Sequence, residues 1–299
     1  MAGAMARVVF VFLDGFGLGP AHPGNPIYAH RMLEPVIGAP LAAGLSVSAP
    51  DLLAKGIDAC LGVPGLPQSA TGQVALFTGI NAAMLLGHHL PAYPCPVLRA
   101  ELGRSNLFLE ALRAGKTATF ANAYRPQYPE MVRAGLVQDS VTTVACRAAR
   151  LPLRGLEDGA YSEAVFWDIT GKSARQAGMD LEEISPEAAG AVVGTLSRRY
   201  DLVVFESFLP DLIGHARHAG RAAEFGEVAT RFLAALAEDL AGEATLVLTS
   251  DHGNMEDLST GSHTRNPVPL IARGPEARRF AAAESIADVT PAILSALAA

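Results

Sequence analysis

Cysteine is scarce in this chain of 299 residues. The only three cysteines are Cys60, Cys95 and Cys146, which are widely spaced and form no CxxC motif. An odd number of cysteines without that motif argues against a disulfide framework and against a zinc site built from thiolates. We interpret the three as small, partly buried residues of a protein in a reducing compartment.

Lysine and clusters of positive charge are also scarce. There are three lysines, Lys55, Lys116 and Lys172, and the formal net charge is −7. No run of lysine and arginine supplies the positive face that nucleic acid or an anionic membrane surface requires. We therefore expect neither nucleic acid nor a membrane as a partner.

Long hydrophobic runs are absent, although half of the residues are hydrophobic. No run reaches the roughly 18 residues that a membrane span needs, and the segment after Arg7 enters a short strand-like run directly. The hydrophobic residues are numerous enough for a sizeable core. We expect a cytoplasmic protein whose residues 1–299 form a single domain.

Strand-like and helical patterns alternate along the chain. Apolar runs at 7–13, 56–61, 116–120, 164–167, 202–205, 245–248 and 266–274 predict strands. Patterns at 69–79, 105–114, 185–199, 224–240 and 288–298 predict helices. This alternation predicts an α/β fold with a mostly parallel sheet and helices on both faces.

Polar residues follow two of the predicted strands. Asp14 comes directly after the run 7–13, and Asp251 and His252 follow the run 245–248. His263 lies further on, in a loop rich in glycine and serine. The carboxyl ends of the strands are where α/β sheets place their sites, and a carboxylate beside an imidazole suggests a metal. A turn or capping role for Asp14, and a simple hydrogen bond between Asp251 and His252, remain the alternatives.

A second pair of metal-type residues follows the strand at 202–205. Asp211 and His215 are four residues apart, so on a helix they share a face and can hold one ion. The alternative is a solvated ion pair. His218, three residues further on, is interpreted as structural.

The segment PQSATGQ, which begins at Pro67, predicts a loop that opens a short helix. A hydroxyl at a helix N-terminus has two interpretations. Ser69 or Thr71 can cap the helix by accepting a backbone N–H. Alternatively, a hydroxyl there can serve as a nucleophile where free N–H groups and the helix dipole receive a phosphate.

The irregular segment 123–160, rich in arginine and polar residues, is expected to form a small lid or an elaboration within the domain. Asn122 is a polar residue at the end of the strand expected at 116–120, and Arg125 follows it. His88 and His89 lie in a loop and are left without an assigned role.

The order of these motifs resembles the alkaline phosphatase superfamily, in the metalloenzyme branch that holds cofactor-independent phosphoglycerate mutase and phosphopentomutase. The matching motifs are LDGFG at Leu13, PQSATGQ at Pro67, DLIGH at Asp211, SDHGN at Ser250 and SHTRNPVP at Ser262. The resemblance extends from Arg7 to the C-terminal helix.

The resemblance implies two metal sites. One set of ligands would be Asp211, His215 and His263; the other would be Asp14, Asp251, His252 and the oxygen of Thr71. Carboxylates and imidazoles without thiolates suit two divalent ions, Zn or Mn, with Mg less suited to three histidines. Two ions roughly 4 Å apart can hold both the attacking and the leaving oxygen of an in-line phosphoryl transfer.

The resemblance also implies the chemistry. Thr71 would attack phosphorus as the catalytic nucleophile, whereas the mutase relatives carry serine, and Asn122 and Arg125 would hold phosphate oxygens of a small phosphorylated substrate. The mutases are distinctly longer and carry a full cap that excludes water, so with a reduced cap we expect a phosphoric-ester hydrolase. A phosphomutase and a non-catalytic metal-bound scaffold are the alternatives.

Overall fold

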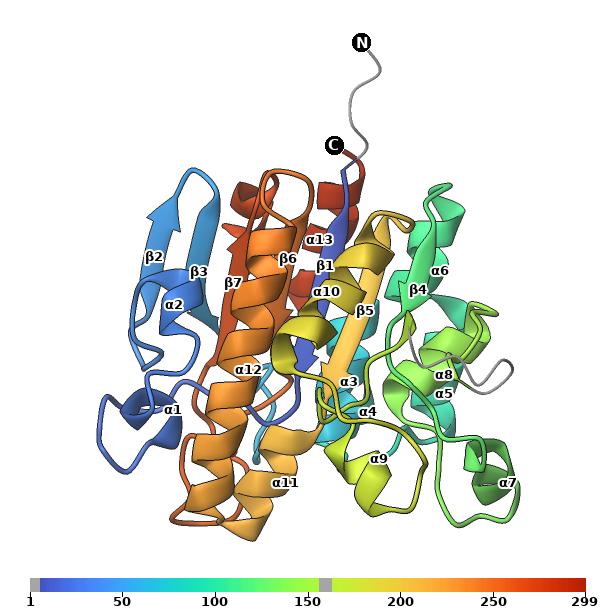
Figure 1. Ribbon diagram of the computed structural model, residues 1–299, viewed down its shortest axis with the longest axis horizontal. Helices are drawn as coiled ribbons and strands as arrows, with labels where there is room; N and C mark the ends of the chain where they lie inside the picture. Colours follow the sequence, from blue (N-terminus) through green and yellow to red (C-terminus); the bar gives the residue numbers. More distant parts are fainter. Residues whose placement is uncertain (1–5, 156–162) are drawn as a thin grey trace.

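A single seven-stranded sheet organises the molecule. The computed structural model describes residues 6–155 and 163–299 (Figure 1). The strands are β1 (Val8–Leu13), β2 (Ser46–Ala49), β3 (Leu52–Ile57), β4 (Ala118–Phe120), β5 (Leu202–Ser207), β6 (Thr245–Thr249) and β7 (Val268–Arg273). Their order across the sheet is β2-β3-β7-β6-β1-β5-β4.

The sheet is mostly parallel, as predicted. Strands β4, β5, β1 and β6 are neighbours and pair in parallel. Beyond β6 the pairing is antiparallel, from β6 to β7, from β7 to β3 and from β3 to β2. Five of the seven strands therefore point the same way, and the carboxyl ends of β1, β5 and β6 meet at one edge.

Helices cover both faces of the sheet, which also confirms the prediction. One face carries α3 (Ser69–Thr78), α4 (Ala82–Leu86), α5 (Pro96–Arg104), α6 (Leu107–Arg113), α8 (Val141–Ala148), η2 (Ala277–Phe280), η3 (Ile286–Asp288) and α13 (Val289–Leu297). The other carries α1 (Pro26–Ala29), α2 (Glu34–Ile37), α10 (Pro186–Ser197), α11 (Leu209–Ala216) and α12 (Ala219–Asp239). In Figure 1, α10 and α12 lie in front of the sheet.

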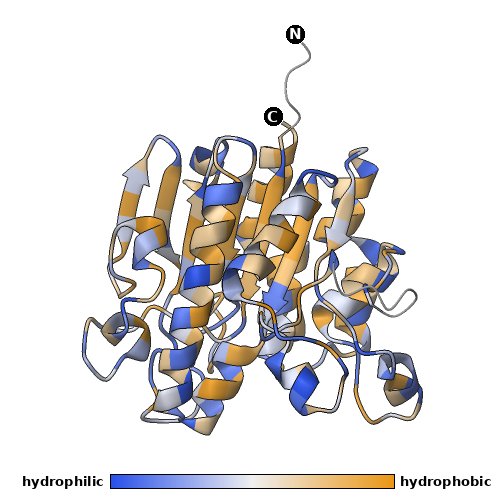
Figure 2. Cartoon of the chain, in the orientation of Figure 1, coloured by the Kyte–Doolittle hydropathy of each residue, from blue (hydrophilic) through white to orange (hydrophobic). Residues whose placement is uncertain are grey.

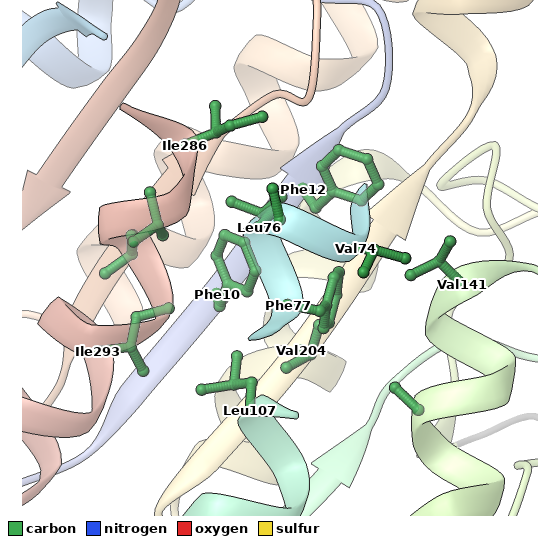
Figure 3. Close-up of a cluster of buried hydrophobic side chains, with 14 of the residues drawn as sticks. Phe10, Phe12, Val74, Leu76, Phe77, Leu107, Val141, Val204, Ile286 and Ile293 are labelled. Atoms are coloured by element: carbon green, nitrogen blue, oxygen red, sulfur yellow. The ribbon is translucent and has the colours of Figure 1, made fainter. Parts of the chain in front are cut away.

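The alternation of side chains along β1 divides the core between the two faces. Phe10 and Phe12 belong to the cluster beneath α3, whereas Val9 and Val11 belong to the cluster beneath α10 and α12. Phe77 of α3 packs against both phenylalanines, with ring centroids 5.9 Å from Phe10 and 6.4 Å from Phe12 (Figure 3). This packing fixes α3 against the central strand.

Hydropathy follows the layers. The central strands are largely orange in Figure 2, and α12 carries blue segments among apolar ones. In the described part of the chain, no helix is both long and apolar enough to span a membrane.

Some local predictions differ from the structure. The strand expected at 164–167 is only an isolated bridge between Val165 and Asn122, and the strand expected at 56–61 lies earlier in the chain, at Leu52–Ile57. The loop that holds His88 and His89 is followed by α5, a helix that was not predicted from the sequence. Alternation of apolar residues was too short in these segments to distinguish a strand from a buried loop.

The segment 123–160, expected as a lid, has two parts in its described portion. Helix α8 buries Val141, Ala145 and Cys146 in the main core, so it belongs to the body of the domain. Helix α7 (Tyr128–Arg133) has no buried residue and lies beside the edge where the parallel strands end (Figure 1). Residues 156–160 lie outside the described residues. A lid role for α7 stays a prediction, as does the division into domains.

Candidate metal centre and nucleophile

Three of the predicted ligands meet at the ends of the two central strands. Asp14 follows β1, and Asp251 and His252 follow β6, which pairs with β1. One ligand atom from each of these three buried residues lies within 4.8 Å of the others. His252 Nε2 is 3.3 Å from Asp14 Oδ1 and 3.4 Å from Asp251 Oδ2. The register of the two parallel strands brings together residues that are 237 or more positions apart.

A second group adjoins the first. Asp211 and His215 lie on α11, four residues apart, and His215 Nε2 is 3.4 Å from Asp211 Oδ2. His263 Nε2 lies 3.1 Å from His215 Nε2 and 3.4 Å from Asp211 Oδ1. Ligand atoms of Asp211, His252 and His263 also lie within 4.8 Å of one another. His252 therefore stands between the two groups that the sequence analysis assigned to separate ions.

Backbone carbonyls orient two of the imidazoles. His263 Nδ1 is 2.8 Å from the Pro67 carbonyl, and His215 Nδ1 is 3.0 Å from the Gly261 carbonyl. A carbonyl can only accept, so each Nδ1 carries a proton, and each Nε2 faces the cluster, where a neutral imidazole would present a lone pair. This is the arrangement in which histidine ligates a metal.

Burial and charge perturb the titration of the cluster. Burial, together with the carboxylates of Asp251 and Asp211, raises the pKa of Asp14 well above its ordinary value. Burial also lowers the pKa of His252. For Asp211, burial acts in the opposite sense, but the hydrogen bond from His263 and the charge of His252 lower its pKa to about 2. Carboxylates are thus crowded together at the sheet edge, in contact with imidazoles.

These residues fit divalent ions. Asp14 Oδ1 is buried and has no hydrogen-bond partner among residues 6–155 and 163–299, and three carboxylates share the cluster. Burying carboxylates together is costly unless a cation compensates them. The donor set of oxygen and imidazole nitrogen suits Zn or Mn.

The hydroxyl of Ser69 contacts this cluster. Its Oγ lies 3.0 Å from His252 Nε2. Ser69 is the first residue of α3, whose first N–H groups have no acceptor within the helix. A hydroxyl in this position faces both the metal-type side chains and a helix N-terminus that favours anions.

Thr71, predicted as ligand and nucleophile, has a different environment. Its hydroxyl donates to the Gln68 carbonyl at 3.2 Å and accepts from the Leu90 N–H at 3.2 Å. The residue is 0% exposed. Its hydrogen-bonding capacity is used by backbone groups, and it faces no solvent from which a substrate could approach. The geometry therefore favours Ser69 over Thr71 as the nucleophile.

Comparison with known proteins agrees with this centre. The model of the metalloenzyme superfamily matches residues 6–299. The chain belongs to the metalloenzyme superfamily. Membership implies divalent metal ions, and the described residues of this metalloenzyme contain two groups able to hold them.

The most similar relatives include two proteins named 2,3-bisphosphoglycerate-independent phosphoglycerate mutase. The one from Paracoccus denitrificans is 35% identical over 176 residues, which are 50% of this chain and 34% of the relative. The one from Cereibacter sphaeroides strain ATCC 17025 is 29% identical over 191 residues, which are 56% of this chain and 37% of the relative. The matched part thus covers little more than a third of each relative.

A solved structure shows the same fold across nearly the whole chain. The cold-active alkaline phosphatase of Shewanella sp. superposes with a TM-score of 0.58 and 11% identity, covering 97% of this chain and 99% of that one. The fold of this metalloenzyme is therefore alkaline-phosphatase-like, as the resemblance implied.

Two polar residues that support the centre, Gln73 and Asn254, were missed in the sequence analysis. Gln73 Nε2 donates to Asp14 Oδ2 at 3.1 Å and to Asp251 Oδ2 at 3.2 Å. Asn254 Nδ2 donates to Asp211 Oδ1 at 2.7 Å. Gln73 lies one helical turn after Ser69, and Asn254 two residues after His252. That spacing was the only signal in the sequence that could have identified them.

Glu256, also missed, joins three loops beneath the ligands. Its buried carboxylate accepts from the N–H of Gly17 at 3.2 Å and from that of Asn254 at 2.8 Å. It also accepts from the Thr264 hydroxyl and from Asn266 Nδ2. These donors come from the loops that follow β1, β6 and His263, so one carboxylate holds the ligand-bearing loops in register.

The predicted substrate residues lie in two different settings. The side chain of Asn122 is buried and pairs with the backbone of Glu206, donating to its carbonyl at 2.8 Å and accepting from its N–H at 2.9 Å. Asn122 thus connects β4 to β5 at their ends, a structural role. Arg125 is exposed on the loop before α7. Its contact with phosphate stays a prediction, whereas the paired amide makes Asn122 a poor candidate.

Histidines outside the cluster act locally. His218 caps α12 by accepting the N–H of Arg221 at 3.2 Å, in line with the structural role expected for it. His88 lies 3.1 Å from the Leu86 carbonyl, and His89 Nε2 lies 3.3 Å from the Val63 carbonyl.

Proposed function

We propose that this metalloenzyme hydrolyses phosphoric esters through a phosphoserine intermediate at Ser69. The observation that carries the proposal is the 3.0 Å separation of Ser69 Oγ from His252 Nε2, at the N-terminus of α3 and beside two metal-type groups. This replaces the phosphothreonine intermediate that the motif suggested.

The chain's own residues account for binding and attack. Asp14, Asp251 and His252 would hold one ion, and Asp211, His215 and His263 the other, with Gln73 and Asn254 fixing the carboxylates. Bound there, divalent ions would lower the pKa of the serine hydroxyl and neutralise charge on the phosphoryl oxygens. The first N–H groups of α3 would receive a phosphoryl oxygen.

The reaction proceeds in two displacements. Ser69 Oγ forms a bond to phosphorus, the ester O–P bond breaks, and the alcohol leaves with the proton that the serine loses. Water then attacks the phosphoserine, which releases inorganic phosphate and restores the hydroxyl. The side chain of His215 is 47% exposed, so water can reach the cluster. This exposure supports hydrolysis as the second displacement.

A phosphomutase is the second candidate, because the curated relatives carry mutase names. In a mutase the phosphoryl group of the phosphoserine returns to a substrate hydroxyl, which requires that water be kept out. The third reading, a metal-bound scaffold without catalysis, leaves the position of Ser69 unexplained.

The test uses protein loaded with Zn or Mn, wild type beside Ser69→Ala. We expect release of nitrophenol from p-nitrophenyl phosphate or bis-p-nitrophenyl phosphate, with a loss of roughly a thousandfold or more in the variant. Whichever substrate is turned over faster distinguishes a monoesterase from a diesterase. Isomerisation of 3-phosphoglycerate without phosphate release would establish the mutase instead. Stoichiometric metal with neither activity would support the scaffold.

A further inference from the structure

Arg265 lies on the loop that carries the ligand His263 and is exposed to solvent. It follows the ligand His263 by two residues, and its side chain is exposed. Its guanidinium Nη1 donates to the Gly65 carbonyl. One bond therefore anchors the side chain, and a guanidinium has four further N–H donors.

Many arginines of this chain are neutralised by carboxylates, such as Arg199 by Glu163 and Arg231 by Glu187. In the part of the chain that the structure describes, no carboxylate lies within ion-pairing distance of Arg265. An uncompensated cation at a site of a protein whose net charge is −7 attracts anions there.

The loop that anchors Arg265 is the one that leads to Ser69. The Pro67 carbonyl of this loop holds Nδ1 of His263, and the Val63 carbonyl contacts His89. Pro64 and Pro67 restrict the backbone between these contacts. The carbonyl that accepts from the guanidinium therefore belongs to a restrained segment that leads directly to Ser69.

Arg265 is nevertheless set apart from the reacting atoms. Gly65 and Arg265 are exposed, whereas Pro67 and His263, at the other end of the same pair of segments, are buried. The phosphoryl group must lie between Ser69 Oγ and the buried ligands. The guanidinium is therefore placed to contact the part of the substrate that extends toward solvent, which is the alcohol that leaves.

We propose that Arg265 binds a second anionic group, a carboxylate or a further phosphate, carried by the alcohol part of the substrate. Guanidinium binds both groups through two parallel N–H bonds, so it discriminates anionic from neutral alcohols. The proposal rests on the proposed function of Ser69, because it assumes that the ester phosphorus lies at that hydroxyl.

A matched pair of esters tests the proposal. 3-Phosphoglycerate and glycerol 3-phosphate differ by a carboxylate in place of a hydroxymethyl group, and both are alkyl phosphates. In metal-loaded Arg265→Ala we expect kcat/KM to fall roughly tenfold or more for 3-phosphoglycerate and to change less than about twofold for glycerol 3-phosphate. For 3-phosphoglycerate, kcat/KM of Arg265→Lys should lie between the values of wild type and Arg265→Ala. Arg278→Ala, an exposed arginine of η2, should match wild type for both.

Equal losses for the two esters would overturn the proposal, because they would mean that Arg265 contacts the reacting phosphoryl group or merely supports the loop. Unchanged kinetics with both esters would overturn it as well.

A binding measurement separates this proposal from the proposed function. Calorimetric titration of Ser69→Ala and of Ser69→Ala/Arg265→Ala, both metal-loaded, needs no turnover. We expect the double variant to bind 3-phosphoglycerate about tenfold more weakly and glycerol 3-phosphate equally. If wild type turns over no ester but this difference is found, the reaction assignment fails and the anion site stands. If turnover depends on Ser69 and the difference is missing, only the Arg265 site fails.

Discussion

The hydroxyl oxygen of Ser69 lies 3.0 Å from Nε2 of His252, although the two residues are 183 positions apart. Their contact brings the first residue of α3 to the end of β6. It joins a group that can attack phosphorus to a group that can hold a metal, and it makes the two central strands and α3 one functional unit.

Replacing Thr71 distinguishes the two hydroxyls of α3. Thr71→Val removes the hydroxyl, so two backbone bonds are lost and we expect destabilisation of about 1–3 kcal/mol. The remaining folded, metal-loaded protein should keep its phosphoryl transfer activity, measured per folded molecule. Mass spectrometry of peptides from acid-quenched turnover should find the phosphate on Ser69. Phosphate on residue 71, or a Thr71→Val protein that is folded but inactive, would instead indicate that Thr71 is the nucleophile.

Replacing Glu256 should loosen the loops that carry the ligands. In Glu256→Gln an NH2 group takes the place of one oxygen and meets N–H or O–H donors, so about two hydrogen bonds are lost. We expect the free energy of unfolding in urea to fall by about 2–4 kcal/mol. Glu284→Gln, at an exposed position, should stay within about 0.5 kcal/mol of wild type. If Glu256→Gln has the same free energy of unfolding as wild type, the hydrogen bonds of Glu256 do not hold the loops.

The close approach of α3 to Asp251 depends on Gly72. A Cβ at this position would lie 2.9 Å from the Asp251 carbonyl oxygen. Gly72→Ala should therefore lower the affinity for metal and the melting temperature, with a cost of about 1–3 kcal/mol, although alanine is the better helix former. Gly103 of α5 has open space around its Cβ position, so Gly103→Ala should leave the melting temperature unchanged or raise it slightly. If both variants behave alike in thermal melts, contact with Asp251 does not limit the packing of α3.

Glu206 gives a prediction about pH. Burial, opposed by the hydrogen bond from Thr142, raises the pKa of this carboxyl to about 8 from 4.5. Between these values the folded protein retains a proton that the unfolded chain has lost, so stability conferred by Glu206 falls as pH rises through this range. Glu206→Gln stays neutral, and its stability relative to wild type should rise between pH 5 and 8 by an amount on the order of a few kcal/mol.

Thermal melts of the two proteins across that range would measure the effect, with Glu284→Gln as the exposed control. A difference from wild type that does not change with pH would mean that Glu206 is already ionised in the folded protein.

Much of the centre could be predicted from the sequence. Asp14, Asp251 and His252 were found because they lie within three residues of the ends of apolar strands, and Asp211 and His215 because four residues form about one helical turn. Spacing and strand ends are local features, and a parallel sheet collects them at one edge without further information. The fold class followed from the same alternation of strands and helices.

Tertiary structure alone decided which hydroxyl faces the centre. Ser69 and Thr71 are two residues apart on α3, which rotates their side chains by about 200° relative to each other. The sequence provides both hydroxyls and a helix N-terminus, but not the rotation of that helix about its axis. Packing of Phe77 against Phe10 and Phe12 fixes the rotation. The long-range bonds of Glu256 and the position of Arg265 were likewise set by contacts between distant loops, which no local pattern records.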